Sequence, residues 1–192
     1  MNLEKYQQYS RIARGLEKAD LVLKDARIVN VFTEEIIRGD IAIQDGIIAG
    51  IGSFHGKEER DLAGRYVCPG FIDSHLHLES TLVTPAELVT VASRHGTTTF
   101  IVDPHESANV SGLAGVDYIL DQTENVKANV YVMMPSCVPA TSIDDNGCTL
   151  TAEDMAPYLH NSRILGLGEV MDSISVVQGE KSMHDKLELF EG

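Results

Sequence analysis

Four apolar runs that recur at a nearly constant spacing constrain the fold of this chain more than any other feature. They read GFIDSHLH, TTTFIVDPH, NVYVMMPSC and RILGLGEVM, and segments with helical spacing lie between them. The polar residues at the ends of the runs are His75, Asp103, Ser136 and Glu169, which are 28, 33 and 33 residues apart. Such spacing is typical of successive strand and helix units of about 30 residues. Strands that alternate with helices predict a parallel sheet.

Two common folds contain such a sheet, and the sequence favours one of them. A dinucleotide-binding fold would place a G-x-G-x-x-G fingerprint after its first strand, and this chain has none there. In a (β/α)8 barrel of the TIM type, the chemistry gathers at the carboxyl ends of the strands. Histidines or carboxylates end three of the four runs. We therefore predict an α/β fold in which residues 67–192 form about four βα units, the first half of such a barrel.

The residues before this region predict a helix and a small β-rich domain. Residues 3–18 have the spacing of an amphipathic helix, and residues 1–18 form the predicted N-terminal helical segment. Its apolar face would consist of Leu3, Tyr6, Ile12 and Leu16. Residues 19–66 contain short alternating runs, which predict a small β-domain. Within it, Asp45-Gly46 separates two apolar runs and indicates a tight hairpin, because both central positions of a type I′ turn need positive φ.

Composition excludes several classes of protein. The formal net charge is −14, and no clustered basic face is apparent, so we expect no nucleic-acid partner. No run of 18 apolar residues and no leader-like N-terminus is present, which predicts a cytoplasmic protein without a membrane partner. The three cysteines form no C-x-x-C pair, so neither a disulfide framework nor a zinc ribbon is favoured.

The stretch PGFIDSHLHLES contains the strongest candidate for a metal site. His75, His77 and Glu79 occupy alternate positions, and alternate residues of a strand point to the same side if the strand continues that far. Two neutral imidazoles on one side can chelate a metal ion. Asp73 could orient one of the rings as a hydrogen-bond acceptor. An H-x-H pair alone also occurs by chance among ordinary surface or core histidines, so the strand-end context carries the interpretation.

Two further stretches end at the same predicted edge. DPHES, residues 103–107, brings Asp103, His105 and Glu106 together, although such a run can also be a solvated loop that caps a helix. Glu169 follows an apolar run, where a buried carboxylate needs a cation or hydrogen-bond donors. A lone buried glutamate is more often paired with arginine than with a metal. The predicted position at one edge with the histidines is what favours the metal.

Together PGFIDSHLHLES, HGTTTFIVDPHESANV, MMPSCVPAT and GLGEVM resemble the adenine deaminases of the amidohydrolase superfamily over about residues 19–171. This resemblance implies metal-dependent hydrolytic deamination of adenine to hypoxanthine and ammonia, with a divalent transition metal, Mn, Fe or Zn, in a binuclear centre. It implies that His75 and His77 bind the first metal and that Glu169 bridges both. The remaining predicted site residues are His105 as a metal ligand, Asp103 and Glu106 as catalytic groups, and Glu79 and Ser136 as contacts to the purine substrate.

The chain is short for this fold, because a whole barrel takes about 250 residues. We therefore expect an N-terminal portion that needs the C-terminal part for activity, with a complementing C-terminal half or a second copy of the chain in a homo-oligomer as the expected partner. Two alternatives remain open: another amidohydrolase reaction, such as hydrolysis of a cyclic amide, and a remnant without catalytic activity. An unrelated zinc deaminase is disfavoured, since His77-Leu78-Glu79 reads H-x-E but no P-C-x-x-C follows.

Overall fold

A computed structural model describes residues 2–191 of the chain, so the outermost residue of each predicted terminal segment, 1–18 and 67–192, lies outside it. The chain divides into two compact units, one up to Pro69 and one from Gly70 onward. Each unit has its own hydrophobic core. The two units are therefore described separately.

The first unit begins with the predicted helix, which is shorter than its apolar spacing indicates. Helix α1 spans Leu3–Ala13, and the side chain of Asn2 caps its start by accepting a hydrogen bond from Lys5 N–H. It ends where Gly15 adopts a φ of 70°, a left-handed conformation that terminates helices. Ile12 is fully buried, but Leu3, Tyr6 and Leu16 are exposed. The prediction of a four-residue apolar face over 3–18 is therefore wrong.

A five-stranded sheet forms the rest of this unit. Its strands are β1 (Ala19–Asn30), β2 (Glu35–Gln44), β3 (Ile47–Gly52), β4 (Gly56–Asp61) and β5 (Tyr66–Val67). The order is β3-β2-β1-β4, and β5 also pairs with β1. The predicted hairpin joins β2 to β3 in an antiparallel pair. Asp45 and Gly46 have φ values of 51° and 76°, which confirms the expected positive φ at both turn positions.

The second unit contains the predicted parallel sheet. Its strands are β6 (Phe71–Leu76), β7 (Thr97–Val102), β8 (Asn129–Met134) and β9 (Ile164–Leu167). They lie in the order β6-β7-β8-β9, and every neighbouring pair is parallel. The predicted succession of βα units is therefore confirmed, and the strands follow the sequential order that a barrel requires.

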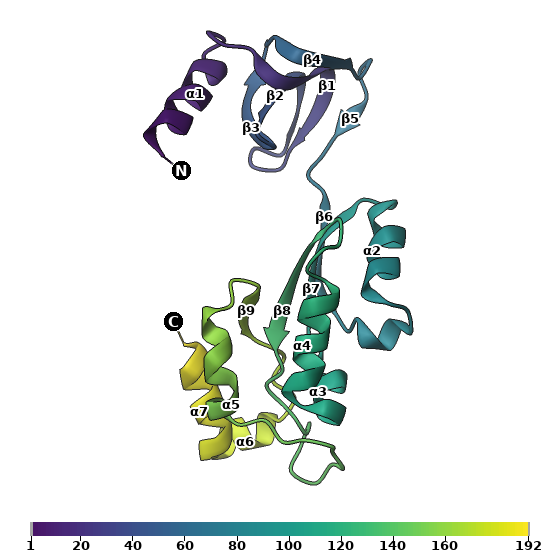
Figure 1. Ribbon diagram of the computed structural model, residues 1–192, viewed down its shortest axis with the longest axis vertical. Coiled ribbons are helices and arrows are strands. Elements are labelled where there is room, and N and C mark those ends of the chain that lie inside the picture. The colour runs from purple at the N-terminus through teal and green to yellow at the C-terminus, as the bar shows by residue number, and fades with distance from the viewer. Residues whose placement is uncertain (1, 192) are drawn as a thin grey trace. The chain divides into compact units, whose positions relative to one another are not determined.

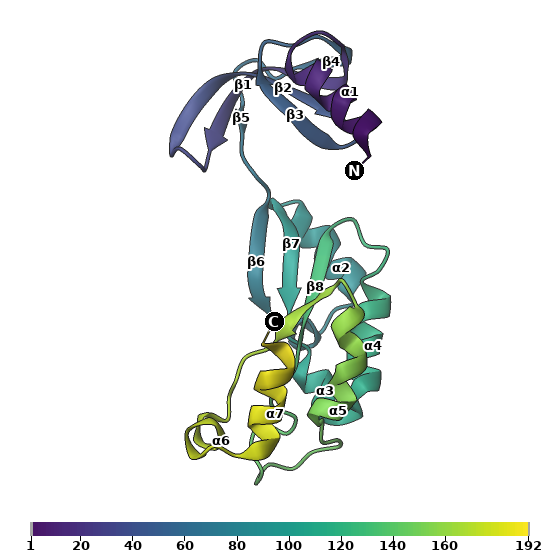
Figure 2. The same ribbon diagram turned by 90° about the vertical axis from the view of Figure 1, so that its left-hand side faces the viewer.

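Helices follow each of these strands. They are η1 (Glu79–Thr81), α2 (Pro85–Ser93), α3 (His105–Ser111), α4 (Leu113–Gln122), α5 (Ala152–Met155), η2 (Ala156–His160), α6 (Ser173–Gln178) and α7 (Lys181–Phe190). The segment after β7, with its continuous helical spacing, is broken at Gly112, which has a φ of 62° and accordingly separates α3 from α4. Helix α4 lies along one face of the sheet in both ribbon views (Figure 1, Figure 2).

The core of this unit lies between that face of the sheet and the helices. Alternate strand residues, such as Phe100, Val102 and Val132, are buried against Val116 and Ile119 of α4. Apolar residues elsewhere in the sheet remain exposed: Ile72 is 63% and Leu165 is 50% accessible. The apolar strand residues are therefore only partly covered within residues 70–191. Within the described part of the chain, no helix has the length and apolar character needed to cross a membrane.

The Asp45-Gly46 turn gives a direct test of the first unit. Gly46→Ala should lower the free energy of unfolding by about 1 kcal/mol, because an added methyl disfavours the left-handed backbone. A steric clash would not contribute to this loss of stability, since an added Cβ meets no atom within 4 Å. Denaturant unfolding measures the change. Gly46→Asn is the matched control and should lose less, because asparagine tolerates this conformation; equal stability of Gly46→Ala and the unchanged chain would contradict the turn.

Candidate metal centre

The candidate site lies at the carboxyl end of the parallel sheet. His75 is the penultimate residue of β6, and His77 follows that strand directly. Asp103 follows β7, and His105 begins α3. Glu169 lies two residues after β9. Because parallel strands end at the same edge of a sheet, their carboxyl ends bring together residues that are far apart in sequence.

The first group of potential ligands consists of His75, His77 and Glu169. His75 Nε2 and Glu169 Oε2 are 3.5 Å apart, and His77 Nε2 and Glu169 Oε1 are 3.7 Å apart. The two Nε2 atoms are 3.1 Å from each other. One atom from each of the three residues lies within 4.8 Å of the others, which is close enough for one metal ion to be bound by all three.

The backbone after β7 sets the orientation of His77. Its Nδ1 lies 2.8 Å from the carbonyl oxygen of Asp103. Since a carbonyl only accepts hydrogen bonds, Nδ1 carries the proton and Nε2 keeps its lone pair. This is the usual arrangement of a metal-binding histidine, whose other nitrogen donates to a nearby acceptor. The sequence suggested Asp73 for such a role, but its Oδ1 accepts a hydrogen bond from the backbone N–H of His75 instead.

The second group consists of Asp103, His105 and the same Glu169. His105 Nδ1 is 3.8 Å from Asp103 Oδ1 and 3.9 Å from Glu169 Oε1. Among the described residues, neither His105 Nδ1 nor Asp103 Oδ1 has a hydrogen-bond partner, although both atoms are buried. Buried polar atoms are nearly always paired, so two such atoms facing each other are suited to bind a shared cation. A divalent cation bound by both would satisfy them.

Asp103 is the most buried of these residues, with 1% of its side chain exposed. Burial raises the pKa of its carboxyl group above the ordinary value, because the charged form loses its hydration. A hydrogen bond from Glu169 N–H to Asp103 Oδ2, 2.9 Å long, opposes that shift. Next to it, a Cβ added to Gly168 would lie 2.3 Å from Asp103 Oδ2. Only glycine fits beside this carboxylate.

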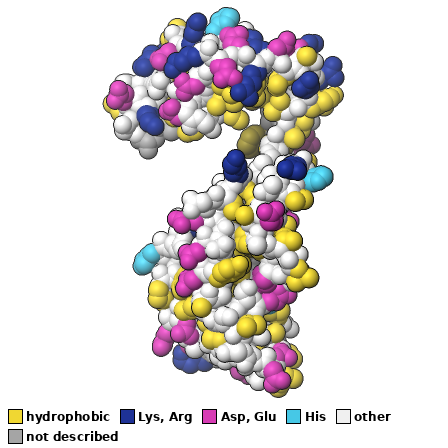
Figure 3. Space-filling model, turned by 45° about the vertical axis from the view of Figure 1, so that its right-hand side comes forward, with side chains coloured by type: hydrophobic (Ala, Val, Ile, Leu, Met, Phe, Trp, Pro, Cys, Tyr) yellow, Lys and Arg dark blue, Asp and Glu magenta, His cyan; other side chains and the backbone are white. Residues whose placement is uncertain are grey.

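The whole arrangement fits a binuclear site for divalent metals. Glu169 contributes to both groups, one carboxylate shared by two sets of ligands. Imidazole nitrogens and carboxylate oxygens suit Zn, Mn and Fe. The surrounding charge also favours cations, since residues 70–192 hold 18 of the 29 acidic side chains but only 5 of the 15 basic ones. In the view of Figure 3, the Lys and Arg side chains gather mainly on the other unit.

Three predicted site residues lie beside these groups rather than within them. Strand β6 ends at Leu76, so the alternating pattern stops before Glu79, which is in η1. Glu79 Oε1 accepts hydrogen bonds from the backbone N–H groups of Glu106 and Ser107, at 3.1 and 3.3 Å. Glu79 therefore holds the start of α3, and the idea that it projects together with both histidines is wrong. The carboxylate of Glu106 is exposed and accepts a hydrogen bond from Ser80.

Ser136 is fully buried, and its hydroxyl group donates a hydrogen bond to the backbone carbonyl of Glu169. Sequence reasoning missed Gly168 and assigned no role to Cys137. No local pattern marks either residue, because their contacts join segments more than 30 positions apart. The only available signal was that both stand next to predicted strand ends.

Comparison with known proteins agrees with this geometry. The profile of the amidohydrolase family matches residues 66–189. That range holds both ligand groups and the whole parallel sheet. The chain belongs to the amidohydrolase family.

Within that family, similar curated proteins include several adenine deaminases. An adenine deaminase from Desulfitobacterium hafniense is 57% identical over 190 residues, 99% of this chain and 33% of that protein. An adenine deaminase from Geobacillus kaustophilus is 51% identical over 172 residues, 90% of this chain and 30% of that protein. The chain thus spans about a third of the length of these relatives. A solved N-acyl-D-glutamate deacylase from Bordetella bronchiseptica is 22% identical, with a TM-score of 0.49 over 62% of this chain and 30% of that one.

The packing of Gly168 against Asp103 can be tested with two glycine variants. Gly168→Ala should weaken metal binding by about 10-fold or more, the usual effect of displacing a group that supports the ligands. Gly166→Ala is the control, because its added Cβ would meet Met133 Cε at an ordinary 3.5 Å. Metal titration by calorimetry measures both affinities. Equal affinities for the two variants would contradict the proposed placement of Asp103.

Proposed function

We propose that this chain carries the metal-binding part of an enzyme that hydrolyses adenine to hypoxanthine and ammonia. The single observation that carries the proposal is the sharing of Glu169 by two groups of potential ligands at one edge of a parallel sheet. We infer the activity from the adenine deaminases that are similar to nearly the whole chain. The fold of the complete enzyme would be a closed (β/α)8 barrel, of which residues 70–191 supply four strands.

The roles follow from the geometry of the two groups. His75 and His77 would bind the first metal, Asp103 and His105 the second, and Glu169 both. For Asp103, a ligand role fits better than the catalytic role that the sequence suggests, because one carboxylate oxygen accepts from Glu169 N–H and the other faces His105. The donor set suits manganese, iron or zinc.

A divalent metal at such a site supplies nucleophilic hydroxide from water near neutral pH. The chain's own groups must then move a proton, because the departing amino group leaves as ammonia only after it is protonated. Glu106 is the best candidate for this step. It follows the ligand His105 directly, its carboxylate is exposed, and the hydroxyl group of Ser80 donates a hydrogen bond to Oε2.

Space for a small ligand is present beside these residues. His105 and Glu106 border a cavity of about 390 Å³, which Asn109 and Cys137 also line. A purine is small enough for this volume. Glu79 would act on the substrate indirectly, since it holds the backbone of Glu106. Ser136 would act through Glu169, because its hydroxyl group is already engaged by the Glu169 carbonyl.

Activity can be tested in a chimera, because this chain is 57% identical to the matching third of the Desulfitobacterium hafniense protein. Replacing that third with this chain should give an enzyme that releases ammonia and hypoxanthine from adenine in equal amounts. Glu106→Gln in the chimera should lower kcat by about 100-fold or more, since general acid-base groups contribute that much. Ammonia assay and chromatography of the purine measure both products.

The parent enzyme and a Glu106→Asp chimera are the controls for that experiment. Release of no ammonia from adenine, combined with opening of a dihydropyrimidine-type ring, would point to cyclic amide hydrolysis instead. A folded chimera that binds metal but turns over neither substrate would identify the chain as a remnant without activity.

Metal binding by the chain itself gives an independent test. A ligand present at 100 times its dissociation constant stabilises the folded state by about 2.7 kcal/mol. Adding Mn²⁺ or Zn²⁺ at such an excess should raise the free energy of unfolding by this amount, and a chelator should remove the gain. Denaturant unfolding measures it. The variant His75→Ala/His77→Ala should show a much smaller response; an equal response would place the metal elsewhere.

A further inference from the structure

The segment that carries Glu169 is held mainly by hydrogen bonds rather than by packing. Strand β9 ends at Leu167, and 40% of the Glu169 side chain is exposed. The Gly168 N–H donates to the Met134 carbonyl at 2.7 Å, and the Glu169 N–H donates to Asp103 Oδ2. These two bonds fix the chain before and at Glu169. The carbonyl group of Glu169 and the backbone after it have other hydrogen-bond partners.

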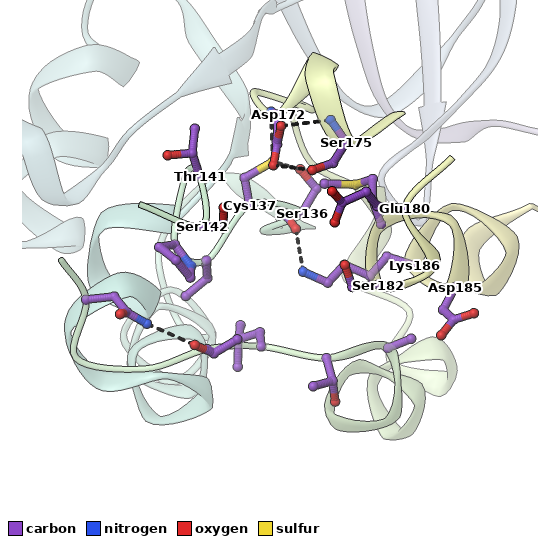
Figure 4. Close-up of a pocket in the computed structure, with 18 of the residues that line it drawn as sticks. Ser136, Cys137, Thr141, Ser142, Asp172, Ser175, Glu180, Ser182, Asp185 and Lys186 are labelled. Atoms are coloured by element: carbon purple, nitrogen blue, oxygen red, sulfur yellow. Dashed lines mark hydrogen bonds between the residues drawn. The ribbon is translucent and has the colours of Figure 1, made fainter. Parts of the chain in front are cut away.

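Two buried residues after β8 provide those partners. The hydroxyl group of Ser136 donates to the Glu169 carbonyl oxygen. The sulfur of Cys137 accepts hydrogen bonds from the backbone N–H groups of Met171 and Asp172, at 3.2 and 3.4 Å. Ser136 is 0% and Cys137 is 3% exposed, so water does not compete for these bonds. Both residues are labelled in Figure 4, where they lie beside Asp172 and Lys186.

We propose that Ser136 and Cys137 are positioning residues of the metal centre. They fix the backbone that follows Glu169 and so direct its carboxylate toward both ligand groups. This inference rests on the metal site of the proposed function. Neither residue touches the ligand atoms themselves. Both act through the backbone that follows β9.

Lys186 of α7 in turn holds Ser136. Its ammonium group donates to the backbone carbonyl of Ser136 at 2.8 Å and is 7% exposed. A buried ammonium needs an acceptor, so this bond anchors the backbone carbonyl of Ser136. The chain of contacts therefore runs from α7 through Ser136 to Glu169. It passes along one wall of a pocket of about 570 Å³ (Figure 4).

A purely structural role for Cys137 predicts different behaviour. A buried thiol that only fills space would, when truncated, lower stability through the lost packing. It would leave the metal affinity of the folded protein unchanged. Loss of a hydrogen-bond acceptor, in contrast, leaves the N–H groups of Met171 and Asp172 without their partner and frees the segment that carries Glu169. Metal affinity therefore separates the two roles.

The experiment titrates the metal-free 192-residue chain with Co²⁺ and measures the dissociation constant, the number of ions bound and the visible absorption of the bound ion. Cys137→Ala and Ser136→Ala should each weaken binding by about 10-fold or more, as observed for groups that support metal ligands. Cys137→Ser keeps an acceptor and should recover part of the affinity. Cys148→Ala is the matched control, because its sulfur contacts the Thr149 carbonyl and not residues 168–172.

Unchanged cobalt affinity and absorption in both Cys137→Ala and Ser136→Ala would overturn the inference, even if their melting temperatures fall. If Cys137→Ala gives no folded protein, Ser136→Ala decides alone, because it removes one oxygen atom. Glu169→Gln distinguishes the two proposals. If the unaltered chain binds no cobalt, or binds it equally well with Glu169→Gln, the metal centre fails and the inference fails with it. If Glu169→Gln weakens binding and the Ser136 and Cys137 variants do not, only the inference fails.

Discussion

The hydrogen bond from the Glu169 N–H group to Asp103 Oδ2 determines the geometry of the site. It joins the ends of β7 and β9, which are not neighbours in the sheet because β8 lies between them. It also gives the two oxygen atoms of the Asp103 carboxylate different roles. One oxygen accepts this bond, and the other is left facing His105 without a hydrogen-bond partner among the described residues. This bond thus contributes to the position of Glu169 and determines which oxygen atom of Asp103 faces His105.

This arrangement has an energetic cost when no cation is bound. A carboxylate that is almost completely buried loses its hydration, and one backbone N–H offsets only part of that loss. The raised pKa of the Asp103 carboxyl group has the same cause, the loss of hydration on burial. A divalent cation at Asp103 Oδ1 and His105 Nδ1 would supply a compensating positive charge. Metal binding at this site would therefore stabilise this part of the fold.

Much of the fold and the general position of the site follow from the sequence, because strand spacing is a local and repeated signal. The four polar residues at the run ends, including His75, Asp103 and Glu169, do gather at one edge of the sheet. Details that depend on distant contacts do not follow from it. The alternating pattern suggested that Glu79 faces the histidines, but the strand ends at Leu76 and Glu79 holds the start of α3. The sulfur of Cys137 accepts from residues 34 and 35 positions away, which no periodicity encodes.

The two ligand groups differ in their access to solvent, and this difference bears on their roles. The side chains of His75 and His77 are 50% and 25% exposed, whereas those of Asp103 and His105 are 1% and 19% exposed. Closed metal sites favour structural stability, and open ones leave a position for water or substrate. The group with His75 and His77 is the open one. In the proposed enzyme this group would leave room for water, while the buried Asp103 would hold Glu169 in place through the Glu169 backbone N–H group.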